Sequence, residues 1–204
     1  MVTTIPTPLP TAQALPRVLV LDTCVLLSNL LRRWLLRLAQ HDCLQPAWSP
    51  IIGDEWRRNA SKIWGVEPDE IQAQWLQLQH DCPGADVGDV QAYKSGLLRS
   101  DPKDWHVIAA ARKVLDCRPG VSVGILTRNL RDFNRSELRA LGISLFDPDT
   151  FLLRCWQHYP DLMDAMIQEV PLHALSIGKP VEAIDVILKR ERLFRLNRVY
   201  TGNP

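Results

Sequence analysis

Polar side chains follow two apolar runs that are typical of buried strands. Residues 18–21 are apolar and partly β-branched, and Asp22 comes directly after them. The run at 121–126 is followed by Thr127, Asn129 and Asp132, which offer a hydroxyl, an amide and a carboxylate. In an open α/β sheet, ligands bind beyond the carboxyl ends of the strands. We therefore expect these side chains to meet at one edge of a sheet.

Three further acids lie on segments with helical spacing. Asp101 and Asp104 stand at the start of one helix, and Glu55 lies among apolar residues of another that begins at 49–50. A glutamate near the apolar side of a helix is uncommon without a partner. A structural interpretation remains open as well, because Asp22 and Asp101 suit helix N-caps and Asp104 suits a capping box.

Together, Asp22, Glu55, Asp104 and Asp132 form a set of carboxylates that can converge on one cleft. Carboxylates in one cleft repel each other and take up protons, and a hard cation such as Mg²⁺ or Mn²⁺ relieves that repulsion. Such an ion lowers the pKa of a coordinated water and binds a phosphodiester oxygen. The chemistry expected of this set is metal-dependent hydrolysis of phosphodiesters.

Strand-like and helix-like segments alternate along residues 17–150. Strands are predicted at 17–22, 44–48, 121–127 and 142–146, and helices at 23–40, 49–63, 68–80, 90–98, 101–111 and 137–141. This alternation predicts an α/β fold with a central parallel sheet and helices on both faces.

The ends of the chain differ from this middle part. Residues 1–16 carry four prolines and are expected to form a flexible tail. The pattern at 151–204 is helical only, which predicts a C-terminal helical extension, and 181–199 is expected to form one basic amphipathic helix.

Composition sets limits on the class of protein. The chain has 204 residues, 46% of them hydrophobic, which fits one domain at 17–150 with appended helices. Its net charge of +1 neither supports nor excludes RNA as a partner. Five scattered cysteines argue against a disulfide framework or a zinc site. No signal peptide or membrane span is recognised, so we expect a cytoplasmic protein with no membrane partner.

Four segments resemble, in order and spacing, the acidic motifs of PIN-domain nucleases, and VapC-type toxins are the nearest in character. The segments are 18–23, 49–55, 101–111 and 126–133. The resemblance implies a PIN-like three-layer α/β/α fold and a Mg²⁺- or Mn²⁺-dependent endoribonuclease. Asp22, Glu55 and Asp104 would be metal ligands and catalytic residues. Many members carry Asp where this chain has Asn129, so either Asn129 or Asp132 would complete the site.

The same resemblance assigns supporting residues. Thr127, Asn129 and Asp101 would lie behind the ligands, with Thr127 orienting a carboxylate. His106 is expected to be a packing residue. Basic side chains near the motifs could hold RNA phosphates, although each also fits a solvated surface charge. They are Arg57, Arg58, Lys62, Arg128 and Arg131.

Partners follow from the resemblance as well. Toxin-type relatives are paired with a small antitoxin protein, and homodimers are common among them. The main alternative is a non-catalytic PIN-like module that binds RNA or protein. Two other classes fit poorly: a haloacid-dehalogenase-type phosphatase needs Asp where Cys24 stands, and a dinucleotide-binding domain needs a glycine-rich turn after its first strand.

Overall fold

A four-stranded parallel sheet forms the centre of the protein, which confirms the predicted α/β class. The computed structural model describes residues 14–176 and 180–202. The strands are β1 (Val18–Leu21), β2 (Gln45–Ala47), β3 (Val123–Leu126) and β4 (Ile143–Phe146). Their order across the sheet is β2-β1-β3-β4, and every neighbouring pair is parallel. β1 and β3 are buried along their whole length because strands lie on both sides of them and helices above and below.

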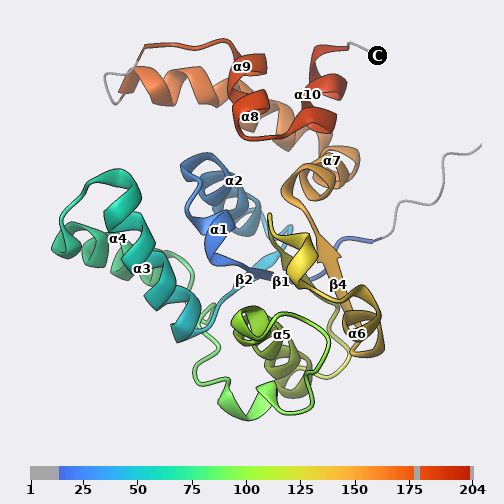
Figure 1. The fold of residues 1–204 in the computed structure, drawn as a ribbon. Coiled ribbons are helices and arrows are strands. Elements are labelled where there is room, and N and C mark those ends of the chain that lie inside the picture. Colours follow the sequence, from blue (N-terminus) through green and yellow to red (C-terminus); the bar gives the residue numbers. More distant parts are fainter. Residues whose placement is uncertain (1–13, 177–179, 203–204) are drawn as a thin grey trace, which may run out of the picture.

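Helices cover both faces of this sheet, as Figure 1 shows, with α5 and α6 below it and α1, α2 and α7 above. The main helices are α1 (Thr23–Leu26), α2 (Asn29–Gln40), α3 (Pro50–Trp64), α4 (Pro68–Asp81), α5 (Trp105–Cys117), α6 (Arg135–Ala140), α7 (Pro148–His158), α8 (Pro160–Ser176), α9 (Ile184–Arg190) and α10 (Phe194–Thr201). This arrangement is compatible with three layers. Short 3-10 turns lie in the connections between these helices and strands: η1 (Gln91–Lys94), η2 (Pro102–Asp104) and η3 (Leu130–Asp132).

The start of α3 follows the predicted signal. Ser49 has an extended backbone, and its side chain accepts a hydrogen bond from the N–H of Ile52. Pro50 occupies the first helical position, where its missing N–H costs nothing. Gly65 ends the helix at φ 63°, a left-handed conformation that glycine adopts readily. This helix places Glu55 beside the sheet.

Three helix predictions were wrong in extent. The expected helix at 23–40 is divided at Ser28, whose extended backbone and side chain cap α2. The expected helix at 90–98 is only the short turn η1. Beyond it, the carboxylate of Glu137 accepts the N–H groups of Leu98, Arg99 and Ser100, which holds that backbone outside a helix. The expected helix at 181–199 is divided into α9 and α10 at Arg192, whose φ is 59°.

The C-terminal helices share the hydrophobic core with the sheet. α10 packs on α7 and α9, and α8 packs on α7. Buried apolar residues form one cluster that extends from Val18 to Leu196. Residues 1–13 of the expected tail lie outside the described residues, whereas Pro16 is buried. Within the described ranges, no helix combines the length and hydrophobicity needed to cross a membrane.

Candidate metal centre

Asp22 lies at the point where the sheet changes winding direction. The chain passes from β1 to β2 on one side and returns to β3 on the other side of β1. Ligands of open α/β sheets bind in the crevice at such a point. Thr127, which follows β3, donates from Oγ1 to Oδ2 of Asp22 at 2.5 Å, and the Asp22 N–H donates to Leu126 at 3.1 Å. These bonds fix the carboxylate of Asp22, a residue only 6% exposed, at the carboxyl end of β1.

The capping interpretation fails for Asp22 and holds for Asp101. Asp22 precedes α1, but its side chain makes no capping hydrogen bond. Asp104 stands before α5 and also makes none. Asp101, in contrast, accepts the N–H of Lys103 at 2.9 Å, as a cap does. The carboxylates of Asp22 and Asp104 therefore have no local backbone role that accounts for them.

Asp101, Asp104 and Asp132 form a compact acidic group. Each offers one carboxylate oxygen, and these oxygens all lie within 4.8 Å of one another. The Asp101 N–H donates to the Asp132 carbonyl at 2.8 Å, which ties η3 to the start of α5. The side-chain amide of Asn129 donates to Oδ2 of Asp132. Asp132 therefore belongs to the acidic group, and Asn129 holds the Asp132 carboxylate by a hydrogen bond without being a member of the group.

The electrostatics of this group suit a cation. Burial raises the pKa of Asp104, and the charges of Asp22 and Asp132 raise it further, to about 6. Asp22 is thus close enough to the group to act on Asp104. A set of carboxylates that repel one another matches the oxygen ligands that Mg²⁺ and Mn²⁺ prefer.

Glu55 reaches the site from α3 through different partners. Its Oε2 accepts the hydroxyl of Thr23 at 3.0 Å and lies 3.4 Å from Nε2 of His106. Burial raises the pKa of Glu55, but His106, Thr23 and Arg58 together outweigh it, so the pKa lies below its ordinary value. Glu55 is outside the compact group found among the described residues. Its contacts are with Thr23, the residue after Asp22, and with His106.

Two residues at the site were missed by sequence reasoning. His106 is buried, but its imidazole approaches Glu55, and Nε2 makes no geometrically good hydrogen bond there. Cys24 donates from Sγ to Oδ2 of Asp22 at 3.1 Å and accepts the N–H of Arg128 at 3.2 Å. Burial raises the pKa of this thiol to about 12, so it stays protonated and able to donate. For Cys24, the i+2 spacing from Asp22 was a usable signal.

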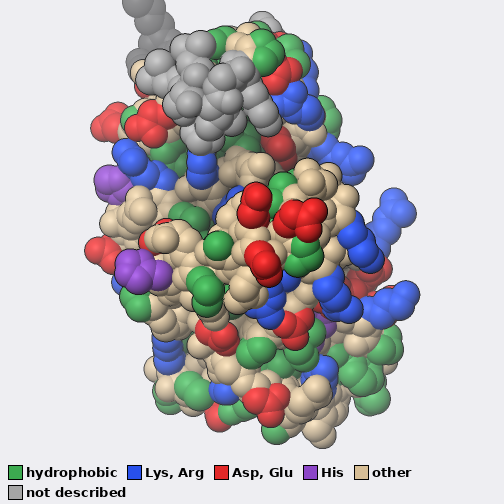
Figure 2. Space-filling model, turned by 90° about the vertical axis from the view of Figure 1, so that its left-hand side faces the viewer, with side chains coloured by type: hydrophobic (Ala, Val, Ile, Leu, Met, Phe, Trp, Pro, Cys, Tyr) green, Lys and Arg blue, Asp and Glu red, His purple; other side chains and the backbone are tan. Residues whose placement is uncertain are grey.

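The five basic residues expected to hold RNA are not equivalent. Arg57 pairs with Asp54 and lies over the Trp75 ring at 5.6 Å, and Arg128 pairs with Glu191 at 2.5 Å. The others, Arg58, Lys62 and Arg131, are exposed. The face shown in Figure 2 carries acidic and basic side chains side by side rather than a field of one sign. Contacts with RNA phosphates would therefore come from single basic residues rather than from a broad basic face.

Replacing Thr127 by valine is expected to reduce metal-dependent activity about 10- to 100-fold, the usual range for a residue that orients a ligand. The reason is the loss of the hydroxyl that holds Asp22 in the crevice. Thr127→Ser keeps the hydroxyl and should retain most of the activity. A steady-state assay of the three proteins checks this, and equal rates for Thr127→Val and wild type would contradict it.

The affinity for Mn²⁺ is expected to fall as the pH drops through about 6. Asp104 holds its proton with a pKa of about 6, and an ion must displace that proton before the carboxylate can bind it. Because one proton is displaced, the affinity for Mn²⁺ should fall about tenfold for each pH unit below about 6. Isothermal titration calorimetry between about pH 5 and 7.5 measures this. An affinity that is constant over that range would show that Asp104 is not a ligand.

Comparisons with families of known proteins, with curated proteins and with solved structures found no match for this chain. The case for a function rests on the site itself. Its parts are the acidic group of Asp101, Asp104 and Asp132, the carboxylate of Asp22 at the switch point of the sheet, and Glu55 on α3.

Proposed function

We propose that the protein is a divalent-metal-dependent endoribonuclease of the PIN type. The observation that carries this proposal is the convergence of Asp101, Asp104 and Asp132 within 4.8 Å, beside Asp22 at the carboxyl ends of β1 and β3. Four acids from three segments of the chain meet where open α/β sheets bind ligands. These segments correspond to the first, third and fourth of the PIN motifs that the chain resembles, and Glu55 stands in the second.

In this proposal, Asp104 and Asp132 hold a Mg²⁺ or Mn²⁺ ion, with Asp101 and Asp22 at its border. When bound, the ion supplies Lewis-acid polarisation of a phosphate and a water of lowered pKa. The protein's residues keep the donor atoms in place. Thr127 and Cys24 orient Asp22, Asn129 orients Asp132, and the cap at Asp101 fixes the start of η2, which leads into α5.

Glu55 supplies a further carboxylate, held between Thr23 and His106. Its lowered pKa keeps it charged at neutral pH, and His106 stands 3.4 Å behind it. The buried imidazole and the Thr23 hydroxyl limit the directions that Glu55 can take. Glu55 can therefore accept a hydrogen bond at a fixed place.

The choice of RNA rests on the resemblance to PIN nucleases, together with exposed basic residues around the site. Arg58 and Lys62 on α3 and Arg131 on η3 can hold phosphates on either side of the acidic group. A small antitoxin partner, a toxin role and a homodimer belong to the same proposal, because VapC-type relatives have them.

A non-catalytic PIN-like module that binds RNA or protein is the second candidate. The observation that favours it is the position of Glu55, which lies outside the compact group. A module of this kind could bind RNA through the same basic residues without cutting it.

The test is incubation of the purified protein with labelled single-stranded RNA in EDTA, Mg²⁺ or Mn²⁺. Cutting in Mg²⁺ or Mn²⁺ that stops in EDTA is the expected result. A single-stranded DNA of the same sequence serves as the control for substrate class. RNA that binds but is never cut, with any of these ions, would favour the binding module.

A further inference from the structure

The two edges of the sheet differ in how they are protected. β2 forms one edge and β4 forms the other. An edge strand presents unpaired N–H and C=O groups to which another extended chain can pair. Proteins usually blunt such edges with proline, charge or a covering segment.

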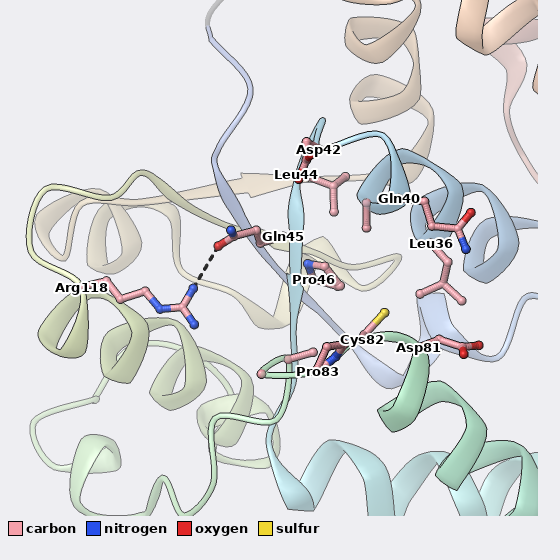
Figure 3. A pocket seen from close by; sticks show the side chains of 13 residues that line it. Leu36, Gln40, Asp42, Leu44, Gln45, Pro46, Asp81, Cys82, Pro83 and Arg118 are labelled. Atoms are coloured by element: carbon pink, nitrogen blue, oxygen red, sulfur yellow. Dashed lines mark hydrogen bonds between the residues drawn. The ribbon is translucent and has the colours of Figure 1, made fainter.

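The β2 edge is blocked. Pro46 lies in the middle of this strand and has no N–H to offer. Just beyond it, the Trp48 N–H donates to the carbonyl of Ala85 and the Val87 N–H donates to the carbonyl of Trp48, both at 2.9 Å. Figure 3 shows Pro46 beside the cavity at this edge, with the guanidinium of Arg118 reaching the side chain of Gln45 at 3.0 Å. At the β2 edge, a further strand would find no continuous row of backbone N–H and C=O groups with which to pair.

The β4 edge is open. The carbonyl of Phe146 accepts from the Thr127 N–H at 3.0 Å, so Phe146 and Ser144 direct their backbone groups toward β3. Alternate residues point the other way, which leaves the groups of Ile143 and Leu145 on the outer edge. In the part of the chain that the structure describes, no backbone hydrogen bond joins these outer groups to another segment.

A basic groove follows this open edge. It is a cavity of about 530 Å³, and its floor is the strand itself from Gly142 to Phe146. Arg135 and Arg139 of α6 and Arg154 of α7 line it, and none of the residues that line it is acidic. Arg135 and Arg139 are exposed and lie one helical turn apart, so their guanidinium groups face the groove together.

We propose that β4 is the docking edge for an extended acidic segment of a partner protein. The segment pairs its backbone with Ile143 and Leu145 as an added strand, and carboxylates on alternate residues pair with Arg135 and Arg139. Backbone pairing gives such contacts their affinity, and side chains give them their specificity. This inference does not depend on whether the acidic site cuts RNA.

Two other occupants fit less well. A second copy of this chain, added edge to edge, would bring the same arginines together, and like charges oppose that contact. RNA would satisfy the arginines but has no repeating N–H and C=O groups to match the strand. The aromatic ring in the groove, Phe146, is 6% exposed and lies under Arg154, so it offers no surface for base stacking.

The probe is a fluorescein-labelled synthetic peptide of about seven residues in which Glu alternates with Val, a length typical of a strand. Fluorescence anisotropy with the full-length protein is expected to show binding that weakens as salt is raised. The double variant Arg135→Glu/Arg139→Glu should weaken it at least about tenfold, as expected when two charge contacts are reversed. Arg198→Glu, an exposed arginine on α10, is the matched control and should leave the affinity unchanged.

A second peptide separates strand pairing from charge attraction. The same sequence with N-methyl groups on alternate residues keeps its charge but loses the N–H groups that pair with β4, and it should bind at least about tenfold more weakly. Equal binding of both peptides, no binding of either, or no effect of the double variant would overturn the proposal. Two further results would overturn it in favour of another occupant: labelled RNA that loses binding in the double variant while the peptide does not bind, or a dimer in sedimentation that the double variant changes.

Discussion

Replacing Asp104 by asparagine should make the protein more stable and inactive at the same time. Metal-dependent cleavage is expected to fall by more than about 100-fold, because the variant loses a charged ligand at the centre of the acidic group. The pKa of Asp104 is raised from 3.8 to about 6, so the folded state binds its proton more tightly than the unfolded state does. The stability from this group is complete below about pH 3.8 and is lost as the pH rises through about 6.

Above about pH 6, the charged Asp104 therefore destabilises the metal-free protein, and a neutral asparagine does not. Asp104→Asn should therefore raise the free energy of unfolding by about 1 kcal/mol, after allowance for solvent screening of a half-exposed group. This corresponds to a rise in Tm of roughly 2–4 °C. Differential scanning fluorimetry in EDTA at about pH 7.5 measures it. Asp54→Asn is the control, because Asp54 is exposed on α3 and its carboxylate pairs with Arg57. A variant that is less stable than wild type, or that still cuts RNA, would contradict the account.

Replacing Trp56 by alanine is expected to cost about 3–5 kcal/mol of the free energy of unfolding, a large part of the roughly 5–15 kcal/mol of an average domain. Trp56 is 1% exposed, and its ring lies 5.6 Å from that of Trp64 and 5.5 Å from that of Trp75. Its Nε1–H also donates to the Leu26 carbonyl at 3.1 Å, which would be left without that partner. Urea unfolding followed by circular dichroism gives the free energy of unfolding.

Trp156→Ala is the matched comparison for this loss. Trp156 is only half-buried and packs edge-to-face against Tyr200 with ring centroids 6.2 Å apart, so its removal should cost about 1–2 kcal/mol. If the two variants were equally destabilised, the burial of Trp56 against Trp64 and Trp75 would not account for the loss. Trp56→Phe, which keeps a ring but loses the N–H, should fall between them.

The fold was predictable where local chemistry decides it. The apolar runs at β1 and β3 read as buried strands, and the Ser49-Pro50 signal located the start of α3. Predictions were wrong where a distant residue intervened. Glu137 accepts hydrogen bonds from three backbone N–H groups about 40 residues away along the chain, and no local sequence pattern predicts these contacts.

The site was likewise predictable where a residue's own segment decides its position, and not where contacts between distant segments decide it. Asp22 follows β1, where the strand-end rule places it, and Asp104 stands at the predicted start of a helix. Whether Asn129 or Asp132 faces the acidic group depends on the hydrogen bond between Asp101 and Asp132, which joins segments 31 residues apart. The pairing of His106 with Glu55 depends on the packing of α5 against α3, and periodicity within either helix does not reveal it.

The most direct test of the central claim is the anomalous diffraction of Mn²⁺ in crystals of the wild type and of Asp104→Asn. The account predicts one strong peak bounded by the carboxylates of Asp104 and Asp132, near Asp22, and no peak there in the variant. A peak elsewhere, or a wild-type site that stays empty at Mn²⁺ concentrations of about 10 mM, far above the affinities of working metal sites, would contradict it.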